Sequence, residues 1–321
     1  MHPENPEPSG RRGVLLNVIA ILLITGIFGF FGWRLRGDWE VFQDVDWWAH
    51  PGLLASHLVL LLVAFGVLVL GWVRTLSICG GNLAASPSAF TWLASNLGKY
   101  IPGKIFMLAG RVELARKLGV RPTVSLSALA LEHVMLLVSA GPFLMWVLLR
   151  GFQIDSDLTW LILVVALAPA VAFVVCPSLL VAFGNLILRA ANQPSFTAKL
   201  RPGDPVRLLA LYFMGWLAYG ASGVFLLGAL GLGSALPFVD GVAVFVAAWM
   251  IGFLSLITPG GIGVREGALV LLLGSAVPAP EAITVALVAR LSWTLVEMGG
   301  VVLGVLIGRR SFSTSDPLTR D

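Results

Sequence analysis

The chain has 321 residues, of which 58% are hydrophobic and only 12% are charged, and its mean hydropathy is +0.92. In soluble domains about a quarter of the residues are charged, so this composition excludes a water-soluble fold. The formal net charge of +4 comes from basic residues that gather in a few connections, as the positive-inside pattern of membrane proteins predicts. No basic surface for nucleic acid is indicated. The two cysteines, Cys79 and Cys176, form no CxxC pair, so neither a metal nor a redox cofactor is expected.

Apolar runs of the length that a bilayer crossing needs, about 20 residues, recur along the chain. Residues 1–13 are rich in Pro, Glu and Gly and predict a disordered cytoplasmic N-terminus. A transmembrane domain is expected over 14–308 and a cytoplasmic tail over 309–321. Within the domain, predicted spans cover 14–35, 53–76, 123–149, 158–188, 206–231, 238–258 and 281–308. With a short, tilted span over 264–277, the sequence predicts an all-α polytopic membrane protein of about eight transmembrane helices.

Two segments, 88–117 and 259–277, do not fit simple spans, because charges and Pro-Gly pairs interrupt their apolar runs. Irregular backbone at membrane depth is tolerated only where protein or a water-filled cavity satisfies its polar groups. Both segments are therefore predicted to be re-entrant hairpins or broken helices, with 88–117 entering and leaving from the cytoplasm. Their turns are expected to be structural, at Pro102, Gly103, Pro259, Gly260, Gly261 and Gly263.

The two broken segments occupy matching places in the two halves of the chain. Each Pro-Gly pair is followed by a basic and then an acidic residue, Arg111 and Glu113 in the first half and Arg265 and Glu266 in the second. Matching interrupted segments are the sequence feature that best indicates a transporter binding region. The pattern suggests a weak internal repeat, although two proline-glycine turns could also resemble each other by chance.

Ionisable residues also lie inside the predicted spans, where a charge at the centre costs about 2.5–3.5 kcal/mol. These are Glu132, His133, Arg290 and Glu297. A pairing of Glu132 with Arg290 is expected, since Arg290 and Glu297 lie about two turns apart and each needs a partner on another helix. The group serves either as an intramembrane gate on a substrate or proton pathway, or as ion pairs that fix helix register.

A second group of polar residues flanks the Pro-Gly breaks. Guanidinium and ammonium groups bind phosphate, and interrupted helices expose backbone amides that favour anions. Contact with a lipid headgroup is expected here, the alternative being a loop bias that only sets orientation. The residues concerned are Asn96, Lys99, Lys104, Arg111, Arg265 and Glu266.

The stretches Ser95–Lys104 and Thr258–Gly267 resemble the two signatures of the lysylphosphatidylglycerol synthase transmembrane-region family, also called flippase-like domain proteins. The resemblance runs over residues 14–308. It implies a multi-pass protein of the cytoplasmic membrane with both termini in the cytoplasm, in which this region moves a phospholipid between leaflets. The soluble aminoacylating domain of some relatives is expected to be absent, so this chain resembles a stand-alone member.

The leading hypothesis is a lipid translocator for a charged-headgroup phospholipid or a polyprenyl-linked lipid. An alternative is a membrane-embedded transferase in a glycolipid or lipid-linked sugar pathway, with Glu132 and His133 as acid and base. A third is an accessory subunit bound to a biosynthetic enzyme. Membrane lipids are the expected partners in the first two cases.

Overall fold

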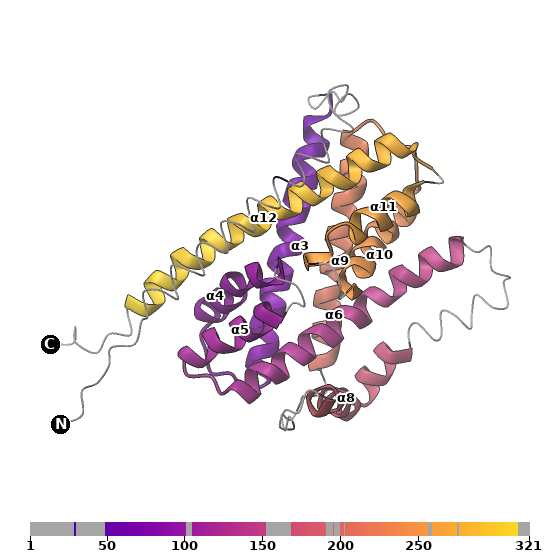
Figure 1. Cartoon of the computed structure of the whole chain (residues 1–321). Helices are drawn as coiled ribbons and strands as arrows, with labels where there is room; N and C mark the ends of the chain where they lie inside the picture. The colour runs from indigo at the N-terminus through magenta and orange to yellow at the C-terminus, as the bar shows by residue number, and fades with distance from the viewer. Residues whose placement is uncertain are drawn as a thin grey trace, which may run out of the picture. The chain divides into compact units, whose positions relative to one another are not determined.

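The structure is a computed structural model of the whole chain, and every regular element in the part that it describes is helical (Figure 1). It describes residues 29, 49–100, 105–151, 168–190, 195, 200, 201, 203–255, 259–274 and 276–313. The expected N-terminus over 1–13 and first span over 14–35 lie outside these residues, as do Pro102, Gly103 and Lys104.

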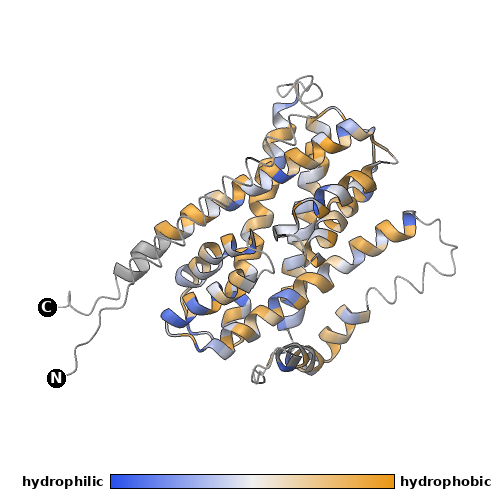
Figure 2. Ribbon diagram, in the orientation of Figure 1, coloured by the Kyte–Doolittle hydropathy of each residue, from blue (hydrophilic) through white to orange (hydrophobic). Residues whose placement is uncertain are grey.

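Four of the described helices are long and apolar enough to cross a membrane, or five if a bent pair counts as one span. They are α3 (Pro51–Ile78), α6 (Pro122–Gly151), α9 (Asp204–Ala229) and α12 (Ala279–Ser313). Figure 2 shows hydrophobic residues along these helices and hydrophilic residues at the turn between α5 and α6. The all-α polytopic membrane fold is confirmed, whereas the number of about eight spans stays a prediction.

The first interrupted segment forms a helical hairpin by itself, and the second forms one together with the predicted span 238–258, whose helix is only 17 residues long and is not among the helices long enough to cross a membrane. Each hairpin has a 3₁₀ turn at its break. In the first, α4 (Ala85–Ser95), η1 (Asn96–Tyr100) and α5 (Ile105–Lys117) follow one another, and α4 packs on α5. In the second, they are α10 (Phe238–Leu254), η2 (Pro259–Gly261) and α11 (Val264–Leu273). At 1.5 Å per residue, the 10 residues of α11 reach about 15 Å, half of a hydrocarbon core of about 30 Å. The expected tilted span over 264–277 is thus too short to cross alone.

Helices α3 and α9 pack side by side in opposite directions, with glycines at the closest points. His57 Nδ1 lies 2.9 Å from the carbonyl oxygen of Ser222, while further along α3 a Cβ on Gly215 would stand 2.8 Å from Val67 Cγ1. Residue numbers in these contacts rise along α3 and fall along α9, so the two helices are antiparallel. Glycine is needed at this seam since a larger side chain would push the helices apart.

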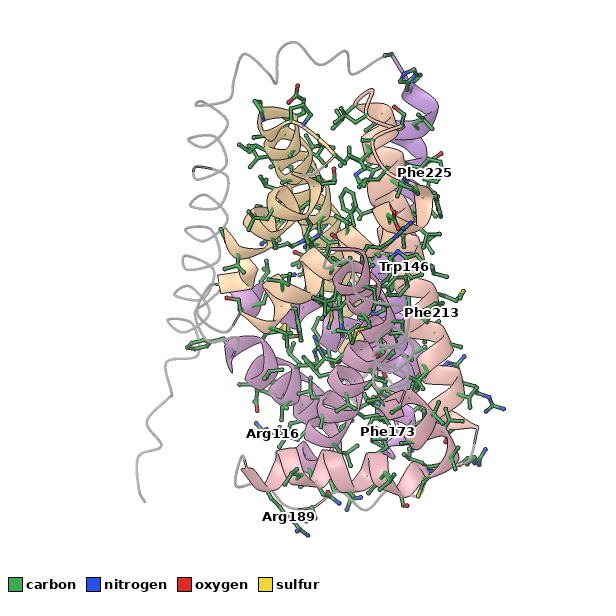
Figure 3. The ribbon with its side chains drawn as sticks, turned by 90° about the vertical axis from the view of Figure 1, so that its right-hand side faces the viewer. Arg116, Trp146, Phe173, Arg189, Phe213 and Phe225 are labelled. Carbon is green, nitrogen blue, oxygen red and sulfur yellow. The ribbon has the colours of Figure 1, made fainter. Side chains whose placement is uncertain are left out.

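The expected single span over 158–188 is bent where the structure describes it. The helical residues Ala168–Val175 and Pro177–Leu186 meet at 109°. Proline has no N–H for the preceding turn and disfavours α geometry in the residue before it, so Pro177 starts a new helix, α8 (Pro177–Ala190). In Figure 3, α8 runs across one end of the bundle, and its Arg189 points away from the other helices.

Candidate functional site

A cavity of about 100 Å³ lies where the two hairpin breaks meet. Eight of the polar or charged residues singled out in the sequence lie in its wall, although they come from five different elements. Those eight are Asn96, Lys99, Arg111, Glu132, His133, Arg265, Arg290 and Glu297.

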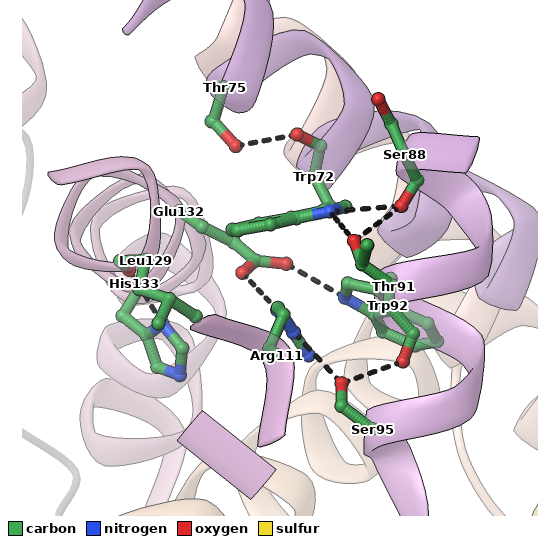
Figure 4. Close-up of polar contacts among 10 residues, drawn as sticks. All are labelled: Trp72, Thr75, Ser88, Thr91, Trp92, Ser95, Arg111, Leu129, Glu132 and His133. Atoms are coloured by element: carbon green, nitrogen blue, oxygen red, sulfur yellow. Dashed lines mark hydrogen bonds and ion pairs between the residues drawn. The ribbon is translucent and has the colours of Figure 1, made fainter. Parts of the chain in front are cut away.

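The Arg111 cluster consists of Trp72, Trp92, Ser95, Arg111 and Glu132, and it ties α3, α4, α5 and α6 together (Figure 4). Arg111 Nη1 donates to Glu132 Oε2 over 2.6 Å, and Arg111 Nε donates to Ser95 Oγ over 3.2 Å. Trp92 Nε1 donates to Glu132 Oε1 over 3.0 Å. The guanidinium carbon lies 4.9 Å from the Trp72 ring centroid and 5.3 Å from that of Trp92. Both oxygens of the carboxylate are therefore engaged, and the cation is neutralised.

The expected pairing of Glu132 with Arg290 is wrong, because each residue has a nearer partner of opposite charge. Arg290 Nε on α12 lies 3.4 Å from Glu266 Oε1 on α11, and Arg290 Nη2 donates to the carbonyl oxygen of Gly260 over 3.1 Å. Glu266 Oε2 also accepts from the backbone N–H of Gly263 over 2.6 Å, which caps the first turn of α11. Glu266 thus fixes the second break, and it does not line the cavity.

Lys99 and Glu297 form an ion pair between η1 and α12. The Nε1–H of Trp293, one turn before Glu297 on α12, donates to the same carboxylate oxygen. Glu297 is 1% exposed and the Lys99 side chain 18% exposed, so this bridge is largely shielded from solvent. It is the ion pair that joins the first hairpin to the last helix.

Arg265 is buried but differs from the other cations of the cavity. Its Nη2 donates to the hydroxyl oxygen of Tyr219, and its guanidinium lies over the rings of Tyr219 and Trp293, at 5.3 and 5.5 Å from their centroids. Among the described residues, no carboxylate lies within ion-pair distance of it. The two rings and one hydroxyl offset only part of the cost of burying this charge.

Backbone geometry at the second break depends on glycine. Gly260, Gly261 and Gly263 have φ values of +58°, +73° and +82°, which side chains with a Cβ rarely adopt. A Cβ on Gly261 would also lie 2.7 Å from the carbonyl oxygen of Gly252 on α10. The break can therefore approach α10 closely, and this brings Arg265 to the cavity.

Sequence reasoning missed the aromatic wall of the cavity. Trp249 packs on Trp216, with ring centroids 4.9 Å apart, and stacks on Phe253 at 5.1 Å. His133 lies next to Phe253, and its Nδ1–H donates to the carbonyl oxygen of Leu129 over 2.8 Å. Trp216 and Trp249 lie within the predicted spans 206–231 and 238–258, and neither is a predicted site residue. Their positions inside the spans and hairpins were the signal that could have indicated a site.

Glu132 and His133, the acid and base of the transferase alternative, both line the cavity but have different partners. They are neighbours on α6, so their side chains leave the helix in different directions. The carboxylate faces Arg111 and Trp92, whereas the imidazole faces the carbonyl of Leu129 and the ring of Phe253. In the described residues, no group of three or more His, Cys, Asp or Glu side chains could hold a metal ion.

A family model described as "Lysylphosphatidylglycerol synthase TM region" matches residues 17–297. The chain belongs to this family. Neither the curated proteins nor the solved structures contain a match to it. Membership of the lysylphosphatidylglycerol synthase TM-region family makes the chain a multi-pass membrane protein of lipid-related processes.

Proposed function

We propose that the protein translocates a lipid with an anionic, phosphate-bearing headgroup between the leaflets of the cytoplasmic membrane. The observation that carries the proposal is the charge balance of the cavity. Four basic side chains line it, Lys99, Arg111, Arg265 and Arg290, against two carboxylates. Among the described residues, three of the cations have a carboxylate partner when Glu266 is counted, and Arg265 has none.

A buried guanidinium without an anion is costly, and ionisable residues inside membrane proteins usually mark the path of a substrate or ion. The planar guanidinium binds a phosphate through two parallel hydrogen bonds. A headgroup phosphate next to Arg265 would supply the missing negative charge, while the aromatic wall would cover the uncharged part of the headgroup. The family's association with lipid processes favours a lipid over a soluble anion.

Purified protein in liposomes that contain labelled phosphatidylglycerol, phosphatidylcholine or a polyprenyl phosphate tests the proposal. Wild-type protein is expected to move an anionic lipid between leaflets. Arg265→Gln is expected to lower the rate about tenfold or more, since a charge-assisted hydrogen bond contributes about 1.5–3 kcal/mol. Arg265→Lys, which keeps the charge and loses the fork, should lie between them.

The matched control is Arg116→Gln, because Arg116 is exposed and pairs only with the exposed Glu113 among the described residues. It should translocate like the wild type. The proposal fails if folded wild-type protein moves no lipid, or if the two glutamine variants behave alike. Turnover of a lipid-linked donor in detergent, where leaflets no longer exist, would instead support a transferase.

A further inference from the structure

The two halves of the chain are equivalent in sequence position. Pro102 and Pro259 are 157 residues apart, and the same shift carries Trp92 onto Trp249. It also carries Pro122, where α6 begins, onto Ala279, where α12 begins. The series α3–α4–η1–α5–α6 therefore repeats as α9–α10–η2–α11–α12, with the long apolar helices at the two ends of each series.

The second series runs in the opposite direction to the first. The equivalent helices α3 and α9 are antiparallel, as their contacts show. In Figure 1, α6 rises from the turn after α5, whereas α12 descends from the turn after α11. The hairpins α4–α5 and α10–α11 thus enter the bundle from opposite ends, and their short helices bring η1 and η2 together inside it.

The contacts between the halves are reciprocal, as a two-fold relation requires. Helix α3 packs on its equivalent α9, and the 3₁₀ turns at the two breaks, η1 and η2, touch each other. Helix α4 of the first half packs on α12 of the second, and α10 of the second half packs on α6 of the first. The chain is therefore an inverted repeat folded around a pseudo-two-fold axis.

The cavity lies on this axis, because equivalent residues of both halves line it. Trp92 and Trp249 are one such pair, and His133 and Arg290 are another. Leu136 and Trp293 are a third. Inverted repeats with broken helices are the construction of carriers in which one site near the bilayer midplane is reached from each side in turn.

The ion pair between Lys99 and Glu297 has no symmetric equivalent. Under the shift, the position of Lys99 corresponds to Leu256 and that of Glu297 to Ala140, so the sequence allows no second ion pair at the equivalent place. The Lys99–Glu297 bridge joins the tip of the α4–α5 hairpin to α12. It therefore fastens the two halves together at this hairpin, whereas another ion pair between the halves, Arg150–Asp240, joins the exposed C-terminal end of α6 to α10.

We propose that the protein works as an alternating-access carrier, in which the Lys99–Glu297 ion pair is the gate on the side where the α4–α5 hairpin enters. Lys117 and Arg121, at the turn after this hairpin, make that side the cytoplasmic one by the positive-inside rule. Breaking the bridge opens the cavity toward the cytoplasm. The inference rests on the proposed function only for the identity of the cargo, because the inverted repeat and the gate are argued from the contacts alone.

The test measures access to the cavity from each side, without any lipid cargo. A background with Cys79→Ala and Cys176→Ala carries Leu136→Cys in the cavity wall as the reporter. A membrane-impermeant maleimide is added to either side of proteoliposomes in which the protein has one orientation. The variant Lys99→Gln/Glu297→Gln removes both charges, so that neither is left buried alone and the fold is kept. The exposed pair in Glu113→Gln/Arg116→Gln undergoes the same chemical change and is the matched control.

Loss of the gate pair is expected to raise the labelling rate from the cytoplasmic side about fivefold or more, which is the lower end of the usual coupling between two sites of a protein. The labelling rate from the other side should not rise. The charge-exchanged variant Lys99→Glu/Glu297→Lys should return labelling to the level of the background. An unchanged rate, an equal rise from both sides, or the same rise in the control overturns the gate. If labelling shifts while no lipid moves in the translocation assay, the gate stands and the proposed cargo falls. If lipid moves and labelling does not shift, only the gate falls.

Discussion

The Arg111 cluster and the surroundings of Arg265 both place a buried guanidinium against two aromatic rings, yet they differ in how its charge is balanced. In the Arg111 cluster the guanidinium has a carboxylate at 2.6 Å, a serine hydroxyl and two indole rings. Arg265 has a tyrosine hydroxyl and two rings, with no carboxylate among the described residues. The comparison separates a cation that holds helices together from a cation that is available to an anion, and neither burial nor residue type alone would do so.

The largest effect is expected from Glu132→Gln, which leaves the Arg111 charge buried without a carboxylate. Breaking a buried pair from one side costs about 3–5 kcal/mol, so the thermal midpoint in detergent should fall strongly. Arg111→Met/Glu132→Leu should recover much of the loss, because it removes both charges. If Glu132→Gln were as stable as the exposed control Glu113→Gln, the statement that Glu132 balances the charge of Arg111 would be wrong.

Gly261→Ala should have the next largest effect, because it strains the break that carries Arg265. A residue with a Cβ at a φ of +73° costs about 1–3 kcal/mol, and the added methyl group would meet the carbonyl oxygen of Gly252. Gly267→Ala is the control, since it lies in α11 with open space around its Cβ position. Equal thermal midpoints for the two variants would show that the break adapts to side chains.

Arg265→Gln is expected to change stability little, in contrast to its effect on translocation. The variant loses the ring contacts, about 0.5–2 kcal/mol, but also relieves the burial of an uncompensated charge. Thermal midpoints of Arg265→Gln and Glu132→Gln measured side by side check this. A loss for Arg265→Gln as large as that for Glu132→Gln would place both arginines in the same structural role.

The smallest effect concerns the exposed pair of Glu113 and Arg116, whose side chains are about half exposed. The hydrogen bond from Arg116 lowers the pKa of the Glu113 carboxyl, so the pair stabilises the folded protein above the ordinary carboxyl pKa. This contribution is lost as the pH falls through the lowered value. Exposed pairs contribute little. The stability difference between wild type and Glu113→Gln should therefore be barely measurable at neutral pH and should disappear in acid; a large difference at neutral pH would contradict this assignment.

Much of the fold could be predicted from the sequence, because apolar length and Pro-Gly interruptions are local properties. The predicted spans at 53–76, 123–149 and 206–231 agree with α3, α6 and α9 to within a few residues. The pairing of charges could not be predicted. Arg111 meets Glu132 only because α5 folds back on α6, and the spacing of residues along the chain does not predict how these two helices pack. Trp92 and Trp249 lie inside apolar segments of the sequence, but no pattern along the chain predicts that they line a common cavity.

The connection that is bent at Pro177 affects the number of membrane crossings between the two halves. Helix α6 leaves the bundle at the end opposite to that where α9 begins, so the chain between Gly151 and Asp204 must return across the membrane. An odd number of crossings between two copies of a unit is what turns the second copy upside down. Duplication of a single ancestral unit would yield this arrangement only with such an insert. The proline-bent connection therefore determines that the second copy is inverted, and none of its described residues lines the cavity.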